Sequence, residues 1–362
     1  MKSYELGQLI ENKRREAEKV INCCKSMNGF YASCDTYFGQ YWLRDMVYVI
    51  KPLLTRDYSI EVSNQLSLFA NKQKKDGDIQ ERIINLEKMP RIIAKVIRNP
   101  PIIDYKYIFK CWVNWYAKTA DTPLLMAIAL KQYEPLIRRY INSDLINTTL
   151  NGIKQFLTTN TNTDHGFIIG GDWRDSMHNY ENVELLSNQV LLFTAQKLLG
   201  EVEVANTLKD EINSVFWDNK LGYYQDYIGS ETFDLLGHAL ALMTDIVHKE
   251  NKDSILFALE SASSEFGFRN ISPPYSQNFC GRKPDSYQNG GVWPFVQGFV
   301  ILALLEAGKF KEAETEFEKL TKQTGFGEWC EPESGISKGS PNQLFSAGMY
   351  LQCFDELKKN GN

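Results

Sequence analysis

The stretch from residue 166 to residue 199 reads GFIIGGDWRDSMHNYENVELLSNQVLLFTAQKLL. It begins with a glycine-rich loop that runs to Asp175, and residues 183–199 then carry apolar side chains at the three- and four-residue spacing of a helix. The same order, a long aromatic loop followed by a helix, recurs in residues 273–307 and 325–357. Long loops on a helical scaffold are where function is commonly placed.

Helical periodicity continues outward from this stretch through most of the chain, and strict alternation over more than four residues is scarce. About a dozen helices in pairs can close into a ring of six hairpins or stack into an open superhelix. Aromatic and acidic loops between the helices favour closure, so we expect an all-α fold, an (α/α)6 toroid. No linker or change of composition divides the chain, which predicts a single catalytic domain over residues 1–362. Helices are expected near residues 4–26, 43–55, 59–73, 104–117, 122–140, 144–158, 183–199, 203–216, 233–247, 252–263, 292–307, 309–322 and 342–357.

The composition excludes several classes of function. Lys and Arg total 40 against 45 for Asp and Glu, and no basic stripe suits a phosphate backbone, so we expect no nucleic-acid partner. The first residues lack an uninterrupted apolar run, which predicts neither a secretory signal nor a membrane span, and hence a cytoplasmic protein. The 7 cysteines include no CxxC pair and are expected to be reduced thiols. No histidine or cysteine spacing is typical of a metal site, so neither a metal nor another cofactor is expected.

Two acids in the loop before residue 183 are candidates for catalysis. Asp172 and Asp175 flank Trp173, and a carboxyl beside an indole has its charged form disfavoured, which raises its pKa toward that of a general acid. The alternative is that these acids cap a helix or pair with Arg174. Hydrolysis of a glycosidic bond needs such an acid and, in the inverting case, a second carboxylate that activates water.

The candidate for this second carboxylate is Glu328, which lies between Gly327 and Trp329. Glu331 and Glu333 follow it, and three acids in one turn are otherwise typical of solvated charge. The position of Glu328 between a glycine and a tryptophan favours catalysis.

Two further segments combine aromatic and polar residues just before a helix. Residues 287–294 read YQNGGVWP and could present amides and a stacking surface to a carbohydrate. Residues 40–48 read QYWLRDMVY and place an arginine and an aspartate at a helix start, where they could grip sugar hydroxyls. The alternatives are a plain turn and a charged helix cap.

Together these four segments resemble, in kind and in order, the six-hairpin glycosidases of the glucoamylase, glycogen-debranching amylo-1,6-glucosidase and processing glucosidase I type. The resemblance runs from Trp42 to Ser346 and so covers nearly the whole chain. It implies an inverting glycoside hydrolase that acts on an α-glucoside or a related small glycoside or short oligosaccharide.

The resemblance also implies roles for the acids. Trp173-Arg174-Asp175 is similar to the debranching-type Trp-Met-Asp, whose aspartate is the general acid, and this implies Asp175. The Gly-x-Asp of the processing glucosidases implies Asp172 instead, and the sequence leaves both open. Glu328 matches the processing-glucosidase pattern in its offsets to a later proline and glycine, which implies that Glu328 is the general base.

Sugar contacts follow from the same resemblance and from the tryptophans beside the acids. Residues 42–45 are similar to the family's Trp-x-Arg-Asp segment. Residues 287–294 are similar to its Tyr-x-Asn-Gly-x-Trp-Pro segment. The expected substrate-binding residues are Trp42, Arg44, Asp45, Trp173, Tyr287, Asn289, Trp293 and Trp329. Residues 118–124 are similar to a stretch of the debranching enzymes and are interpreted as a helix start.

The chain departs from the family in two respects. We expect it to lack the amino-terminal β-sandwich that many relatives carry, which puts polymer binding in doubt. Arg174 replaces an apolar residue and is expected to change the surroundings of the acid.

The rival functions on the same toroid are a sugar epimerase, which moves a proton with paired histidines, and a non-catalytic carbohydrate-binding protein. The chain has 4 histidines, so the epimerase is possible. A glutamate at position 328 argues for water as the nucleophile rather than the phosphate used by inverting phosphorylases. The sequence does not choose the glycoside that is cleaved or the oligomeric state.

Overall fold

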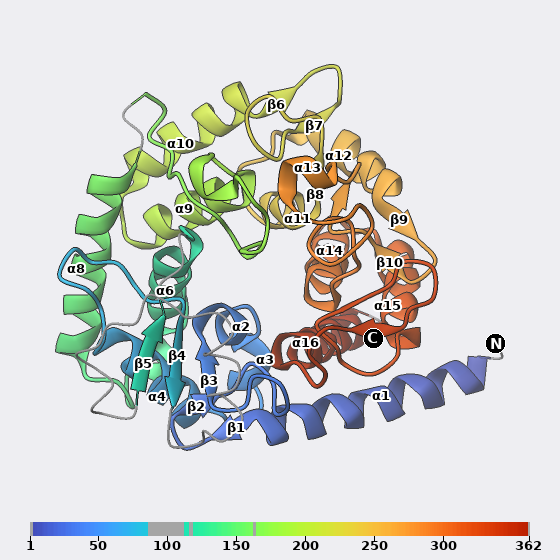
Figure 1. Cartoon of the computed structure of the whole chain (residues 1–362), viewed down its shortest axis with the longest axis horizontal. Helices are drawn as coiled ribbons and strands as arrows, with labels where there is room; N and C mark the ends of the chain where they lie inside the picture. Colours follow the sequence, from blue (N-terminus) through green and yellow to red (C-terminus); the bar gives the residue numbers. More distant parts are fainter. Residues whose placement is uncertain (1–2, 86–111, 116–118, 162–163, 361–362) are drawn as a thin grey trace.

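The computed structural model describes residues 3–85, 112–115, 119–161 and 164–360. Within these residues the chain forms two concentric layers of helices arranged as a ring (Figure 1). The inner layer consists of α2 (Leu43–Val47) with α3 (Ile50–Leu54), α6 (Asp121–Gln132), α9 (Leu186–Leu198), α11 (Leu235–Leu242), α14 (Pro294–Glu306) and α16 (Leu344–Asn360). The outer layer consists of α1 (Ser3–Cys24), α4 (Ser59–Ala70), α8 (Ser143–Asn160), α10 (Val202–Val215), α12 (Lys252–Ala258) and α15 (Phe310–Lys322).

The inner helices pack in cyclic order. α2 contacts α6, which contacts α9, and the series continues through α11 and α14 to α16, which contacts α2 again. Inner and outer helices alternate along the chain, and an inner helix forms a hairpin with the outer helix that follows it, as α9 does with α10 and α14 with α15. The prediction of an (α/α)6 toroid is confirmed, and the open superhelix is excluded because the ring closes.

The two layers differ in their sequence patterns as their positions require. Every residue of α14 from Pro294 to Leu304 is buried, because an inner helix is covered on all sides. The outer helix α15 buries a single face. Its buried residues follow the three- and four-residue spacing of an amphipathic helix and are Ala313, Glu316, Phe317, Leu320 and Thr321.

Proline explains where two predicted helices divide. The helix expected at 43–55 breaks between α2 and α3, since Pro52 has no N–H to bond the carbonyl of Tyr48. The helix expected at 122–140 divides into α6 and α7 (Glu134–Ile137), and Pro135 lies in the first turn of α7. The interpretation of residues 118–124 as a helix start agrees with α6, which begins at Asp121, while Lys118 lies outside the described residues.

One expected helix is wrong where the structure describes it. Residues 112–115 of the stretch 104–117 form strand β5 (Trp112–Trp115), and the rest of that stretch lies outside the described residues. β5 pairs antiparallel with β4 (Arg82–Asn85), which pairs with β3 (Gln40–Trp42). The periodicity of a short apolar run does not separate a helix from a strand.

The remaining strands form two-residue antiparallel ribbons in the loops. These are β1 (Lys25–Ser26) with β2 (Gly29–Phe30), β6 (Trp217–Asp218) with β7 (Tyr223–Tyr224), β8 (Phe233–Asp234) with β11 (Ile271–Ser272), β9 (Ser263–Ser264) with β10 (Gly267–Phe268), and β12 (Trp329–Cys330) with β13 (Ser337–Lys338). Short helical segments are α13 (Gln277–Cys280), η3 (Tyr180–Asn182), η4 (Lys249–Asn251) and η5 (Leu259–Ala262).

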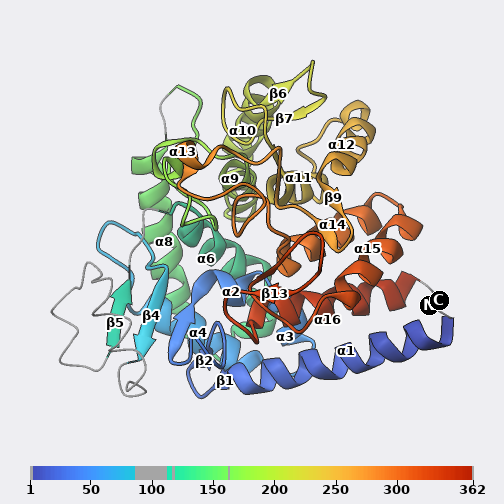
Figure 2. The same cartoon turned by 45° about the vertical axis from the view of Figure 1, so that its right-hand side comes forward.

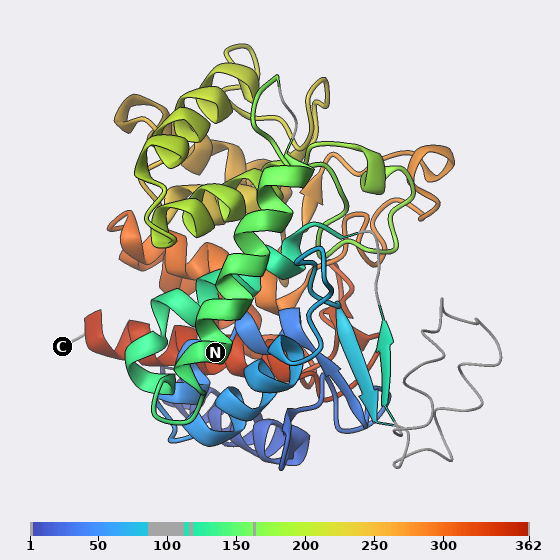
Figure 3. The same cartoon turned by 90° about the vertical axis from the view of Figure 1, so that its left-hand side faces the viewer.

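The first and last helices of the described chain lie side by side. α1 packs along α16 and also contacts α15, and Figure 2 shows this close approach. In Figure 3 the cyan strand β4 and the orange loop that carries α13 lie on the same side of the ring. In the part of the chain that the structure describes, no helix is both long and apolar enough to cross a membrane.

Candidate active site

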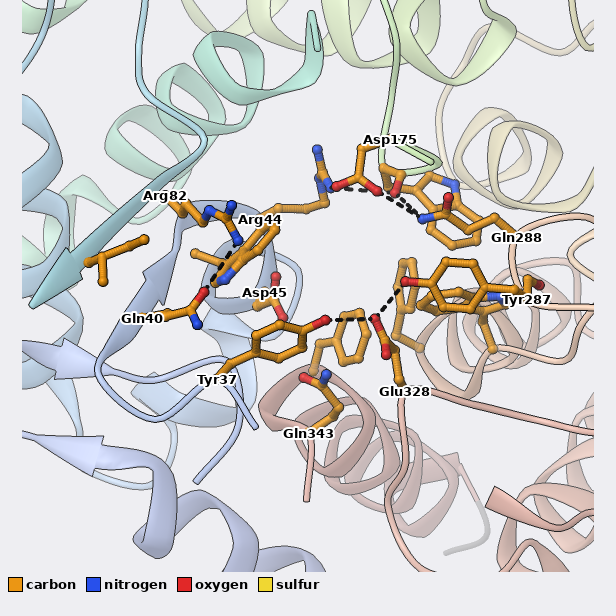
Figure 4. Close-up of a pocket in the computed structure, with 16 residues that line it drawn as sticks. Tyr37, Gln40, Arg44, Asp45, Arg82, Asp175, Tyr287, Gln288, Glu328 and Gln343 are labelled. Atoms are coloured by element: carbon orange, nitrogen blue, oxygen red, sulfur yellow. Dashed lines mark hydrogen bonds and ion pairs between the residues drawn. The ribbon is translucent and has the colours of Figure 1, made fainter. Parts of the chain in front are cut away.

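A cavity of about 320 Å³ opens where the inner helices begin. Its lining comes from the first turns of inner helices, from the loops before them and from strand β4, which are far apart in sequence. The lining residues are Tyr37, Gln40, Trp42, Arg44, Asp45, Arg82, Ile84, Trp173, Asp175, Tyr287, Gln288, Trp293, Phe295, Glu328, Gln343 and Phe345. Figure 4 shows Asp175 and Glu328 on opposite walls of this cavity.

Asp175 is held at the cavity wall by neutral and charged neighbours. Gln288 Nε2 donates to Asp175 Oδ1 at 3.2 Å and to the carbonyl of Trp173 at 2.9 Å. Arg44 Nη1 lies 3.7 Å from Asp175 Oδ2. The Asp175 side chain keeps 26% of its surface exposed, so its carboxyl is reachable from the cavity.

Asp172, the alternative acid, does not line this cavity. It is 1% exposed and accepts hydrogen bonds from Arg174 Nη2 at 2.7 Å and from Ser187 Oγ at 2.6 Å. Burial alone would raise the pKa of Asp172, but the Arg174 guanidinium and these hydrogen bonds hold it below its usual value. A carboxyl in this setting stays ionised and has no proton to donate.

Arg174 forms a sealed cluster of buried charges with Asp172, Asp226 and Asp234. Its guanidinium pairs with Asp226 at 2.8 Å and lies 3.6 Å from Asp234. Arg174 and both of these aspartates are fully buried. The expectation that Arg174 changes the surroundings of the acid therefore applies to Asp172 rather than to Asp175.

Glu328 is fixed by donors on two sides. Tyr287 Oη donates to Glu328 Oε1 at 2.9 Å, and Tyr37 Oη lies 3.5 Å from the same oxygen. The backbone N–H of Ser340 donates to Glu328 Oε2 at 3.0 Å. Burial and the charge of Glu328 both raise the pKa of each tyrosine, so the phenols keep their protons and remain donors to Glu328.

Gly339 leaves the space that the Glu328 carboxylate occupies. Its φ of +72° is a left-handed conformation, and a Cβ there would come within 2.4 Å of Glu328 Oε2. The carboxylate is therefore fixed by close backbone approach as well as by hydrogen bonds.

Arg44 and Asp45 lie at the start of α2, beside the acid. Arg44 Nε pairs with Asp121 Oδ2 at 2.7 Å and its Nη2 bonds Asp121 Oδ1 at 3.2 Å. Burial, with the nearby charges of Glu328 and Asp175, raises the pKa of Asp45 to about 7 despite the adjacent guanidinium. Asp45 can therefore present either a donor or an acceptor to a hydroxyl near neutral pH.

Six of the eight predicted substrate-binding residues line the cavity, and two do not. Asn289 is fully buried, and its amide bonds the backbone of Tyr275 and Arg282. Trp329 packs against the Tyr287 ring, at 6.3 Å between centroids, outside the cavity lining. The predicted residues that do line it are Trp42, Arg44, Asp45, Trp173, Tyr287 and Trp293.

Several residues of the cavity carried no usable signal in the sequence. Tyr37 and Arg82 lie in segments without a recognisable motif, and β4 brings Arg82 over the Trp42 ring at 4.6 Å. Gln288 lies inside the segment 287–294, but the sequence pattern does not show that Gln288, rather than Asn289, lines the cavity. The other lining residues that were not predicted are Gln40, Ile84, Phe295, Gln343 and Phe345.

The four histidines lie outside the cavity lining. His238 is fully buried, and its burial lowers its pKa to about 3, so it is a neutral core residue. His165 pairs with Glu211 at a half-exposed position. Over the described residues, no group of three or more His, Cys, Asp or Glu side chains is placed to hold a metal ion.

Two comparisons with known proteins agree with this geometry. The family model described as amylo-alpha-1,6-glucosidase matches residues 183–326. A solved glycosidase superposes with a TM-score of 0.68 at 14% identity, over 99% of both chains. The fold is that of the six-hairpin glycosidases. The predicted resemblance is thereby confirmed in fold over the whole chain and in sequence over residues 183–326.

Other solved structures have the same six-hairpin glycosidase fold. A GH63 mannosylglycerate hydrolase from Thermus thermophilus, in complex with Tris and D-glycerate, superposes with a TM-score of 0.69 at 14% identity, over 94% of this chain and 99% of that one. A glycosidase variant in complex with glucose superposes with a TM-score of 0.66 at 13% identity, over 99% of both chains. A search of curated protein sequences finds no significant match.

Proposed function

We propose that this protein is an inverting glycoside hydrolase in which Asp175 is the general acid and Glu328 the general base. The observation that carries the proposal is that these two carboxyls occupy opposite walls of one cavity (Figure 4). Inverting glycosidases require this arrangement, with room for a water molecule beside the base and about 6.5 to 9.5 Å between the carboxyls. Asp172 is not proposed as the acid, because it is ionised and sealed from the cavity.

The reaction follows from the roles of the two groups. Glu328 removes a proton from a water molecule whose oxygen bonds to the anomeric carbon, while Asp175 gives its proton to the glycosidic oxygen as the bond from carbon to that oxygen breaks. The products are the free sugar with inverted configuration and the released alcohol. Asp175 ends ionised and Glu328 protonated, and exchange with solvent restores both.

The cavity walls suit a small polyhydroxylated ring. Three buried polar atoms on lining residues have no hydrogen-bond partner among the described residues, namely Trp42 Nε1, Trp173 Nε1 and Gln343 Oε1. Buried polar atoms normally have a partner, and sugar hydroxyls can both donate and accept. Together with the tryptophan faces, these atoms support an α-glucoside or a related small glycoside or short oligosaccharide as substrate.

Binding roles follow from position. Arg44, Asp45, Trp42, Trp173, Tyr287 and Trp293 contact and orient the sugar; Asn289 and Trp329 support the loops behind them. We further propose that the protein acts as a single catalytic domain in the cytoplasm. The six described cysteines are free thiols, which supports a reducing compartment.

The test is a screen of the purified protein against disaccharides, aryl glycosides and glycosyl glycerates, with NMR of the first-formed anomer. We expect hydrolysis with inversion, and loss of at least about 10²-fold in kcat for Glu328→Gln. Azide should rescue Glu328→Ala and give a glycosyl azide of inverted configuration.

The matched control is Glu333→Gln, because Glu333 is 72% exposed and only five residues away. It should keep wild-type turnover. Retention of configuration, or full turnover by Glu328→Gln, would refute the proposed base. Binding of sugars without turnover would favour the carbohydrate-binding protein, and an epimerised free sugar would favour the epimerase.

A further inference from the structure

Glu81 is a buried carboxyl that touches the proposed acid without lining the cavity. It directly precedes β4 and is 3% exposed. Its carbonyl accepts the backbone N–H of Leu43 at 3.2 Å, which fixes this residue beside the start of α2. Its side chain is within hydrogen-bonding contact of the Asp175 carboxyl.

Three carboxyls share the single guanidinium of Arg44. Asp121 takes the two short hydrogen bonds, while Glu81 Oε1 and Asp175 Oδ2 lie 3.6 Å and 3.7 Å from the terminal nitrogens. Arg82 also acts on Glu81 and Asp175, but two positive charges do not balance three negative charges in a buried setting, because each uncompensated charge loses its hydration. At least one of these carboxyls is therefore neutral.

Glu81 is the carboxyl best placed to carry the proton. Burial raises the pKa of Glu81 well above its usual value, and the adjacent Asp175 raises it further. Glu81 Oε1 accepts no hydrogen bond within the described chain, so no such bond stabilises a negative charge on this oxygen. A proton on Glu81 can form the hydrogen bond between this side chain and Asp175.

We propose that Glu81 is a positioning residue that shares one proton with Asp175 and so keeps the general acid able to donate at neutral pH. The inference rests on the proposed function, in which Asp175 is the acid. Two like groups in contact do not both ionise readily, so the pair retains a proton to higher pH than a lone carboxyl would. The leaving group receives its proton from Asp175, and Glu81 acts only through Asp175.

Charged and titratable groups face this pair from several elements, and each contributes to the pH at which the shared proton is lost. They are Arg44 and Asp45 from α2, Asp121 from α6, Arg82 from β4, and Tyr37, Tyr287 and Glu328 from the loops around the cavity. A test of the pair therefore changes Glu81 or Asp175 alone.

The first experiment needs no substrate. Protein labelled with ¹³C at the carboxyls of Asp and Glu is titrated by NMR, and the Glu81 resonance is the one that Glu81→Gln removes. We expect it to titrate well above the ordinary glutamate value of about 4.3. In Asp175→Asn it should titrate at lower pH, because the neighbouring charge is gone. A Glu81 resonance with an ordinary midpoint that ignores Asp175→Asn would overturn the pair, whether or not the protein hydrolyses a glycoside.

The second experiment separates positioning from structure. Glu81→Gln keeps a hydrogen-bond donor but holds no exchangeable acid proton, so the alkaline limb of kcat/KM should move to lower pH. On an alkyl glycoside at pH 8 we expect about a tenfold loss, the factor for a shift of one pH unit. A glycosyl fluoride of the same sugar, whose leaving group needs no proton, should lose less than about twofold.

The controls make the outcome decisive. Glu316→Gln alters another buried carboxyl, one that bonds Gln297 of α14 and Lys319 of α15, and should leave the pH profile unchanged. Equal losses by Glu81→Gln on the fluoride and on the alkyl glycoside would show a purely structural role and refute the inference. If the wild-type protein hydrolyses nothing, the proposed function fails, while the NMR titration still decides the proton-sharing pair.

Discussion

Two buried arginines in this molecule, Arg44 and Arg174, each have three carboxyls around them. Of these two clusters, only the one around Arg44 lines the cavity. Arg44 lies among Asp121, Glu81 and Asp175, and the last of these is 26% exposed. Arg174 lies among Asp172, Asp226 and Asp234, and none of these three is more than 1% exposed. The clusters have the same charge composition but differ in access to solvent.

The difference shows what makes a carboxyl chemically useful. In the sealed cluster, Tyr180 and Tyr275 donate to Asp226 at 2.6 and 2.8 Å, and Ser187 donates to Asp172. These hydrogen bonds satisfy the charges and hold the loop before α9 in place. In the open cluster Asp175 receives one amide hydrogen bond and faces the cavity. We therefore expect stability to depend on the sealed cluster around Arg174, and proton transfer on the open cluster around Arg44.

The largest effect is expected from a substitution of Asp175, the exposed carboxyl of the cluster around Arg44. Asp175→Asn removes the donated proton and should lower kcat by about 10²- to 10⁴-fold on substrates with poor leaving groups. The variant should unfold at nearly the wild-type denaturant concentration, because Asp175 is partly solvated. Steady-state kinetics and urea denaturation measure the two quantities. Wild-type activity in Asp175→Asn would contradict the division of roles.

The same substitution at Asp172, in the cluster around Arg174, should lower the stability of the protein instead. Asp172→Asn removes one charged partner of the buried Arg174, and the loss of such a partner typically lowers the free energy of unfolding by about 3–5 kcal/mol. The folded fraction should keep kcat within a few-fold of wild type. Denaturation curves and active-site-titrated kinetics distinguish these results. A large loss of kcat with unchanged stability would make Asp172 the acid after all.

A smaller effect concerns the pH dependence of stability, to which Asp234 of the cluster around Arg174 contributes. Burial raises the pKa of Asp234 to about 8, despite the opposing charge of Arg174. The folded protein thus holds a proton there that the unfolded chain releases above about pH 3.9, so this contribution to stability is present at low pH and is lost as the pH rises toward 8.

Asp234→Asn removes this dependence. Asparagine keeps the cap on α11, where Asp234 Oδ2 accepts the N–H of Gly237 at 3.1 Å. Between pH 5 and pH 8 the unfolding free energy of the variant should fall less than that of wild type, by up to about 1.4 kcal/mol per pH unit. Asp144→Asn, at an exposed position in the first turn of α8, should match wild type. Equal slopes for Asp234→Asn and wild type would show that Asp234 is ionised in the folded protein.

The ring could be predicted from sequence because its signal is repeated. Each hairpin pairs an all-apolar helix such as α14 with an amphipathic one such as α15, and this pattern is visible without coordinates. The strand β5 was not predictable, since a four-residue run such as WVNW has too few positions to separate the two periods. The breaks at Pro52 and Pro135 follow from a known rule that periodicity alone overlooks.

The site was predictable only where chemistry and motif coincide. Glu328 and Asp175 lie in aromatic loops before inner helices, and those loops converge because all inner helices begin on the same side of the ring. Sequence reasoning did not separate Asp172 from Asp175, since the two differ in burial and in contact with Arg174. Both differences arise only in the folded chain. Glu81 was missed because its importance comes from a contact made through β4, and nothing local marks it.

The packing of α1 against α16 has a consequence for synthesis on the ribosome. Tyr350 Oη bonds the carbonyl of Ile10, and Lys13 Nζ bonds the carbonyls of Gln323 and Gly325, across more than three hundred residues. A growing polypeptide can fold its early hairpins as they emerge, but contacts of such long range form only at the end of translation. Until then, the surfaces of α1 and α14 that pack against α16 stay uncovered and vulnerable to aggregation. Completion of the final helix converts a stack of hairpins into a closed wall around a cavity.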